Sequence, residues 1–194
     1  MSLNKEDVLK IFTSTEALLE GHFLLTSGRH SNQYFQCAKV LQYPEHTSQI
    51  CSLIANHFKD YEIDTVIAPA MGGMIVGYEV TRQLNKRSIF TERENKVMTL
   101  RRGFSLAKSE KVLICEDVVT TGGSVFEVIK IVKEFGAEVV GVGSIVDRSN
   151  GKVDFGYEFF PSLRLNAISY PTEDCTICKE GKLELVKPGS RKVF

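Results

Sequence analysis

Short runs that are apolar at nearly every position recur along the chain, and segments with the apolar spacing of amphipathic helices separate them. The clearest runs are "DTVIAPA" and residues 112–115 and 138–146. Strands that are apolar on both faces are typical of a parallel sheet covered by helices on both sides. The sequence therefore predicts an α/β fold with a mostly parallel central sheet flanked by helices, in a single domain over residues 1–194.

The remaining elements follow from periodicity and from turn residues. Two strands, 20–25 and 33–40, flank the turn "TSGRHSN" and belong to a small N-terminal unit of about residues 1–42. The charged segment 92–102 is expected to be a loop. Helices are expected at residues 4–12, from Pro44 to about residue 58, after "MGGMIVG" as far as residue 84, and at residues 124–135. Further strands are expected at residues 87–91 and in "LRLNAISY".

Charge balance excludes some classes of function. The chain has 24 basic and 24 acidic residues, which argues against a broad surface for nucleic acid or anionic membrane. The N-terminus has acids early and no apolar signal core, and no run approaches ~18 apolar residues. We expect a soluble cytoplasmic protein with neither nucleic acid nor membrane as a partner.

Five cysteines in such a chain are most simply reduced thiols. Cys175 and Cys178 form a single CxxC in "EDCTICKEG". A structural zinc site needs two more soft ligands, and the sequence has no second CxxC and no histidine pair at finger spacing. We therefore interpret this stretch as a turn with two thiols and predict no metal ligands in the protein, with zinc or redox chemistry as the alternative.

Ligands of parallel α/β sheets bind beyond the carboxyl ends of the strands. Four segments that are rich in glycine, hydroxyl or charged residues follow predicted strands. These segments are 69–73, 92–96, 116–124 and 147–151. The sequence predicts that they form one binding site.

The stretch "VLICEDVVTTGGS" joins two acids to a loop of hydroxyls and glycines. The amides after Thr120 lead into a helix N-terminus, which favours a phosphate, whereas Glu116 and Asp117 would repel one. A sugar phosphate satisfies both halves, because its phosphate can bind the amides while its hydroxyls bind the carboxylates. Neither GxxxxGK[ST] nor GxGxxG is present. The alternative is a helix-capping turn with exposed acids.

This stretch resembles the phosphoribosyl pyrophosphate (PRPP) signature of the type I phosphoribosyltransferases. "GHFLLTSGRHSNQYF", "APAMGG" and "IVDRSNG" extend the resemblance to the orotate phosphoribosyltransferase family. The resemblance implies transfer of the phosphoribosyl group of PRPP to orotate in pyrimidine synthesis. It also implies Mg²⁺ held mainly through PRPP and pyrophosphate, a homodimer with shared active sites, a base-binding hood at about residues 1–42, and a cis peptide between Ala70 and Met71.

The same resemblance assigns roles to residues. It implies that three residues act in catalysis: Lys96 and Arg93, which lie in the family's mobile loop, and Asp117. It also implies that orotate contacts Thr120, Arg148, Tyr34 and Phe35. PRPP would bind Glu116, Asp117, Val118, Val119, Thr120, Thr121, Gly122, Gly123 and Ser124. An arginine fork and an aromatic face suit a planar anion such as orotate. The alternatives are a solvated charged turn at 93–96 and ordinary core packing of either Tyr34 or Phe35.

Two positions depart from the family pattern. Thr26 and Gly72 stand where many members have lysine, so Arg93, Lys96 and Arg101 or Arg102 gain importance. A phosphoribosyltransferase for a purine or another base, and a PRPP-sensing regulator, remain as alternative functions.

Overall fold

The larger sheet has six strands in the order β5-β4-β3-β6-β7-β8. The computed structural model describes residues 3–25, 28–166 and 168–188. β5 pairs antiparallel with β4, and the other neighbouring pairs of this sheet are parallel, which confirms the expected mostly parallel architecture. The strands are β3 (Thr65–Pro69), β4 (Arg87–Glu94), β5 (Val97–Leu100), β6 (Lys111–Val119), β7 (Glu138–Asp147) and β8 (Phe159–Arg164).

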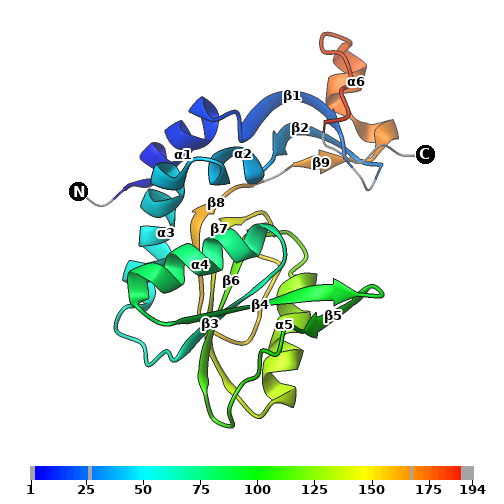
Figure 1. Cartoon of the computed structure of the whole chain (residues 1–194). Helices are drawn as coiled ribbons and strands as arrows, with labels where there is room; N and C mark the ends of the chain where they lie inside the picture. Colours follow the sequence, from blue (N-terminus) through cyan, green and yellow to red (C-terminus); the bar gives the residue numbers. More distant parts are fainter. Residues whose placement is uncertain (1–2, 26–27, 167, 189–194) are drawn as a thin grey trace.

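Helices cover both faces of this sheet (Figure 1). Buried residues of α1 (Lys5–Ser14), α3 (Pro44–Phe58) and α4 (Gly72–Leu84) pack into one core cluster. Buried residues of α5 (Gly123–Glu134) pack into a second cluster with the opposite face. Gly77 lets α4 approach β3 closely, since a Cβ at this position would lie 2.8 Å from the Cβ of Ala68.

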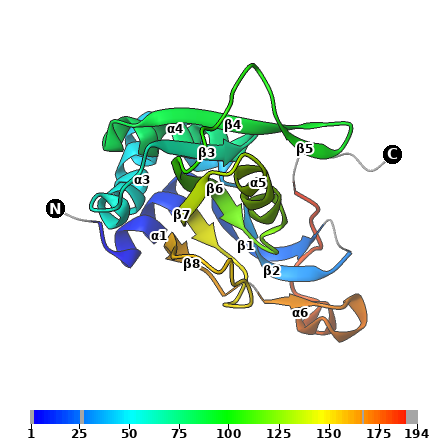
Figure 2. The same ribbon diagram turned by 90° about the horizontal axis from the view of Figure 1, so that it is seen from below.

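A second, small sheet joins two strands from the N-terminal part of the chain to one from its C-terminal part (Figures 1 and 2). Its antiparallel strands are β1 (Leu18–Leu24), β2 (His30–Phe35) and β9 (Ser169–Tyr170), in that order. The 3₁₀ helix η1 (Thr172–Asp174) and the short helix α6 (Thr176–Glu180) follow β9. Beyond them, Val186 forms a parallel bridge with Phe23 of β1. Residues separated by most of the sequence therefore meet in this sheet.

Several predicted elements are confirmed and others are wrong. α3 has the predicted bounds, and Asn4 caps α1 through a capping box with Asp7. The predicted strand 33–40 ends at Phe35, and the short helix α2 (Ala38–Leu41) follows. "LRLNAISY" is not one strand, because its ends belong to β8 and β9 in different sheets. The departure noted at Thr26 lies outside the described residues.

Within the described residues, none of the helices has the length and apolar character needed to cross a membrane.

Candidate active site

Glu116 and Asp117 lie inside β6, although the sequence predicted that this strand would end at Cys115. The strand continues because β7 pairs with it as far as Val119. Glu116 is only 8% exposed. Burial first, and then repulsion from Asp117, raises the pKa of the Glu116 carboxyl well above its ordinary range. The two acids therefore form a buried and a half-buried carboxyl side by side at the carboxyl end of the sheet.

The turn after β3 packs directly against these two acids. A Cβ at Gly73 would lie 2.9 Å from Oε1 of Glu116, and a Cβ at Gly72 would overlap the Asp117 carboxylate. The peptide between Ala70 and Met71 is cis, as predicted. The Asp117 carboxylate therefore explains why glycine stands at position 72. A lysine at this position would have no room for its side chain while Asp117 keeps its present orientation.

The hydroxyl–glycine turn leads from β6 into α5. Gly122 is the N-cap of α5 with φ 74°, and a Cβ there would lie 2.8 Å from the Phe155 ring. No side chain of the described residues caps this helix, so its first-turn N–H groups are open to an anion. Thr120 and Thr121 are exposed and Ser124 is half-buried. The turn therefore has the geometry of a phosphate cradle.

Two predicted contacts, Val118 and Val119, precede this turn within β6. Val119 is buried, so its side chain belongs to the core, whereas Val118 is half-buried. The Val118 N–H donates to Oδ1 of Asp117, and β7 pairs with both residues, so their main-chain groups serve the sheet and its acids in the single chain.

Arg148 follows β7 and is tied to the same edge, because its backbone N–H donates to the Val119 carbonyl (2.8 Å). Burial lowers the pKa of its guanidinium, and the nearby Tyr34 phenol acts in the opposite direction. Tyr34 of the small sheet thus lies within electrostatic reach of Arg148. Phe35 points away into the core, where its ring meets Phe12 edge-on at 5.0 Å. Tyr34 is the member of the aromatic pair that remains half-buried.

The segment 92–102, predicted as a loop, begins with a β-hairpin. Asn95 (φ 50°) and Lys96 (φ 70°) form its two-residue turn, which suits the twist of the paired strands. Arg93 donates two hydrogen bonds to Glu127 of α5 (3.1 and 2.5 Å), and Lys96 is exposed.

The other basic residues of this hairpin also have partners. Arg101 and Arg102 both pair with Glu92. In the single chain, ion pairs therefore hold three of the four basic side chains of residues 92–102.

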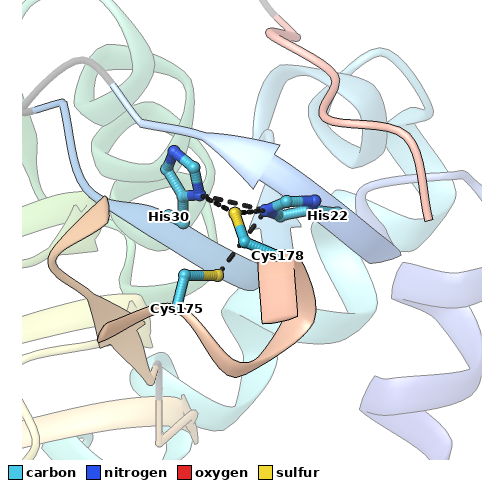
Figure 3. A group of neighbouring side chains, drawn as sticks. All are labelled: His22, His30, Cys175 and Cys178. Atoms are coloured by element: carbon cyan, nitrogen blue, oxygen red, sulfur yellow. Dashed lines mark hydrogen bonds between the residues drawn. The ribbon is translucent and has the colours of Figure 1, made fainter. Parts of the chain in front are cut away.

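Cys175 and Cys178, interpreted from the sequence as a turn with two thiols and no histidine pair, do have two histidine neighbours in the fold. His22 of β1 and His30 of β2 lie against both cysteines, and the four potential ligand atoms lie within 4.8 Å of one another (Figure 3). The sequence did contain a signal for this group. His22 precedes the predicted turn "TSGRHSN" and His30 lies within it, and the antiparallel pairing of β1 with β2 brings the two together.

The chain is similar to known proteins both in sequence and in structure. Residues 38–157 match the phosphoribosyl transferase domain family. The chain is 57% identical over 190 residues to the orotate phosphoribosyltransferase of Caldicellulosiruptor bescii, covering 98% of this chain and 100% of the relative. It is 56% identical to the Desulforamulus reducens orotate phosphoribosyltransferase, with the same two coverages.

Solved structures with low sequence identity share the fold. Orotate phosphoribosyltransferase from Aeropyrum pernix superposes with a TM-score of 0.71 at 23% identity, covering 81% of this chain and 93% of that one. Adenine phosphoribosyltransferase from Thermoanaerobacter pseudethanolicus gives a TM-score of 0.61 at 16% identity, with coverages of 69% and 88%. The fold is thus common to enzymes named for different bases, and the choice among them depends on the close relatives. On that basis, this chain belongs to the orotate phosphoribosyltransferase family.

Proposed function

We propose that this protein transfers the phosphoribosyl group from PRPP to orotate, giving orotidine 5′-phosphate and pyrophosphate in pyrimidine synthesis. The observation that carries the proposal is the 57% identity, over nearly the whole chain, to a relative named for this activity. The candidate site agrees with it, because two adjacent acids, a phosphate cradle and a half-buried arginine lie along one edge of the sheet.

In this proposal PRPP lies along the ends of β3 and β6. Its 5′-phosphate accepts hydrogen bonds from the amides and hydroxyls of the turn 120–124, and its ribose hydroxyls donate to Glu116 and Asp117. The pyrophosphate lies against the turn 70–73, where glycines allow a close approach to the main chain. Because Gly72 offers no cation, main-chain donors contribute more to pyrophosphate binding here.

Orotate would lie between the small sheet and Arg148. The half-buried guanidinium can make two parallel hydrogen bonds to a carboxylate, and Tyr34 supplies an aromatic face. Thr120 adds a hydroxyl at the end of β6. An acidic, planar base therefore fits this side of the site better than a purine does.

Transfer at the anomeric carbon builds negative charge on the departing pyrophosphate. Bound Mg²⁺ would neutralise part of that charge. Two carboxylates are fewer ligands than a dedicated protein site offers, which agrees with an ion held mainly through substrate oxygens. Lys96 and Arg93 are the cations that we assign to the leaving group.

The proposal includes a homodimer in which these cations come from the neighbouring subunit. Three apolar side chains on one side of α4 and its entry support such an interface, since each is well exposed in the single chain. They are Met71 (82%), Ile75 (46%) and Tyr78 (66%). Cytoplasmic location is part of the proposal.

The test is incubation of the protein with PRPP, Mg²⁺ and a panel of bases, following the loss of orotate absorbance and the formation of pyrophosphate. We expect orotate to be consumed only when PRPP and a divalent cation are both present. Turnover of adenine or xanthine with orotate inert would replace the proposal with a purine phosphoribosyltransferase. PRPP binding without turnover of any base would favour a PRPP-sensing regulator.

A further inference from the structure

Four side chains, from β1, from β2 and from the segment 175–178, meet at the outer end of the small sheet. They are His22 on β1, His30 on β2, Cys175 after η1, and Cys178 in α6 (Figure 3). The two histidines are 4% and 3% exposed, and Cys175 is fully buried. Burial of polar groups is unfavourable unless their hydrogen-bonding or ligand capacity is used, so this grouping requires an explanation.

The His22 ring already has a fixed orientation. Its Nδ1 lies 3.2 Å from the Leu183 carbonyl oxygen. A carbonyl can only accept, so Nδ1 carries the proton and the lone pair of the neutral ring is on Nε2. Metal-bound histidines typically have this arrangement, in which the nitrogen not bound to metal donates to a carbonyl or carboxylate.

Hydrogen bonding alone does not satisfy the group. Nε2 of His22 lies 3.0 Å from Nδ1 of His30, 3.6 Å from Sγ of Cys175 and 3.5 Å from Sγ of Cys178. One in-plane lone pair accepts one good hydrogen bond, not three. A cation at the centre, bound to Nε2 and to the other three atoms, would use the capacity of all four.

Four of the six separations among the ligand atoms have the spacing of tetrahedral coordination, and the other two, from Cys175 Sγ to His30 and to Cys178, are within 4.8 Å. Zn–N bonds of about 2.0–2.1 Å and Zn–S bonds of about 2.3 Å put neighbouring N and S ligands about 3.5 Å apart, and two N ligands about 3.3 Å apart. The observed N···S distances of 3.6, 3.5 and 3.2 Å lie close to the first value. The N···N distance of 3.0 Å is only slightly shorter than the second.

We propose that His22, His30, Cys175 and Cys178 bind one zinc ion, in a structural site separate from the Mg²⁺–PRPP site. Two thiolates and two imidazoles in a tetrahedron suit zinc, and four protein ligands leave no open position for catalysis. The ion fastens the segment after β9 to β1 and β2. It therefore stabilises the sheet that carries Tyr34, without touching the reacting groups.

The test is metal analysis of the full-length protein, purified without a histidine tag and dialysed against metal-free buffer. We expect about one zinc per chain by elemental mass spectrometry. The double variant Cys175→Ser/Cys178→Ser should lose nearly all of it. Cys51→Ala, which removes a buried thiol of α3, and Asp117→Asn, which changes the PRPP edge, should each retain the full zinc content.

A second measurement uses the wild-type protein alone, so that it does not depend on folding of the variants. A mercurial thiol reagent in the presence of a zinc-binding dye should release one zinc as two thiols react. Substitution by cobalt should give the visible absorption of a tetrahedral site with thiolate ligands. Wild-type protein that contains no zinc and binds neither added zinc nor cobalt would overturn the proposal, as would zinc retained by the double variant or another metal at full occupancy. Neither measurement uses orotate or PRPP, so the outcome is independent of the proposed activity.

Discussion

At the scale of single residues, Glu116 has the least ordinary environment of the candidate site. Its carboxyl is nearly inaccessible and adjoins a second acid, so its pKa is raised in the folded protein. The native state therefore holds this proton more tightly than the unfolded state does. The resulting contribution to stability is fully present at pH values below the ordinary pKa of 4.5. It is lost as the pH rises from there through the raised pKa of the folded protein.

Replacement Glu116→Gln removes this titration. Without PRPP, we expect the difference in melting temperature, variant minus wild type, to increase steadily as the pH rises from about 5 to about 8. The underlying change in the free energy of unfolding cannot exceed about 1.4 kcal/mol per pH unit. Thermal melting across this range measures the effect, with the exposed Glu45→Gln as control. Parallel curves for wild type and Glu116→Gln would show that Glu116 titrates as an ordinary carboxyl.

At the scale of elements, strongly patterned segments were predictable from the sequence and segments shaped by distant partners were not. α3 was predicted with its bounds because Pro44 at its start and its apolar spacing are both local signals. β6 was predicted too short, since its last residues are held by pairing with β7, and no residue within 116–119 reveals that partner.

The candidate active site and the group of histidines and cysteines show the same division between local and distant signals. Glu116, Asp117 and the turn 120–124 are contiguous in the sequence, so one motif predicted them together. His22 and Cys178 are 156 residues apart, and only the fold brings them within 3.5 Å. The cysteine pair was therefore visible from the sequence, but its histidine partners were not recognised.

The hairpin of β4 and β5 offers a test of the role of Arg93. Its ion pair with Glu127 joins two partly exposed side chains, so the pair contributes only about 0–1 kcal/mol to stability. Glu127→Gln should leave turnover unchanged, because it frees Arg93 without removing it. Arg93→Ala should lower kcat by roughly 100-fold if the guanidinium stabilises the leaving pyrophosphate.

Steady-state kinetics on both variants, with melting curves to verify folding, measure this difference. Equal losses of activity in Arg93→Ala and Glu127→Gln would mean that the pair only holds the hairpin in place.

At the scale of the whole molecule, the proposed dimer makes a prediction about shared sites. Lys96→Ala and Asp117→Asn should each inactivate the enzyme. Mixing the two should restore activity, because a hybrid dimer has one site with both groups intact. With random exchange, about one site in four is intact.

Native mass spectrometry of the mixture of the two variants verifies subunit exchange, because Lys96→Ala is lighter than Asp117→Asn by most of a lysine side chain and the hybrid dimer has an intermediate mass. Absence of recovery after verified exchange would show that Lys96 serves the site of its own chain.

The small sheet also has a consequence for the order in which the molecule is completed during synthesis. All six strands of the larger sheet have been synthesised once Arg164 has been added. β1 and β2 are made early but lack β9, the thiols of Cys175 and Cys178, and the main-chain partner Val186 until much later. Contacts of such long sequence separation form slowly. The pairing of the larger sheet can therefore be completed before that of the small sheet, and in that interval the half that carries Tyr34 has an unpaired edge that a molecular chaperone would protect.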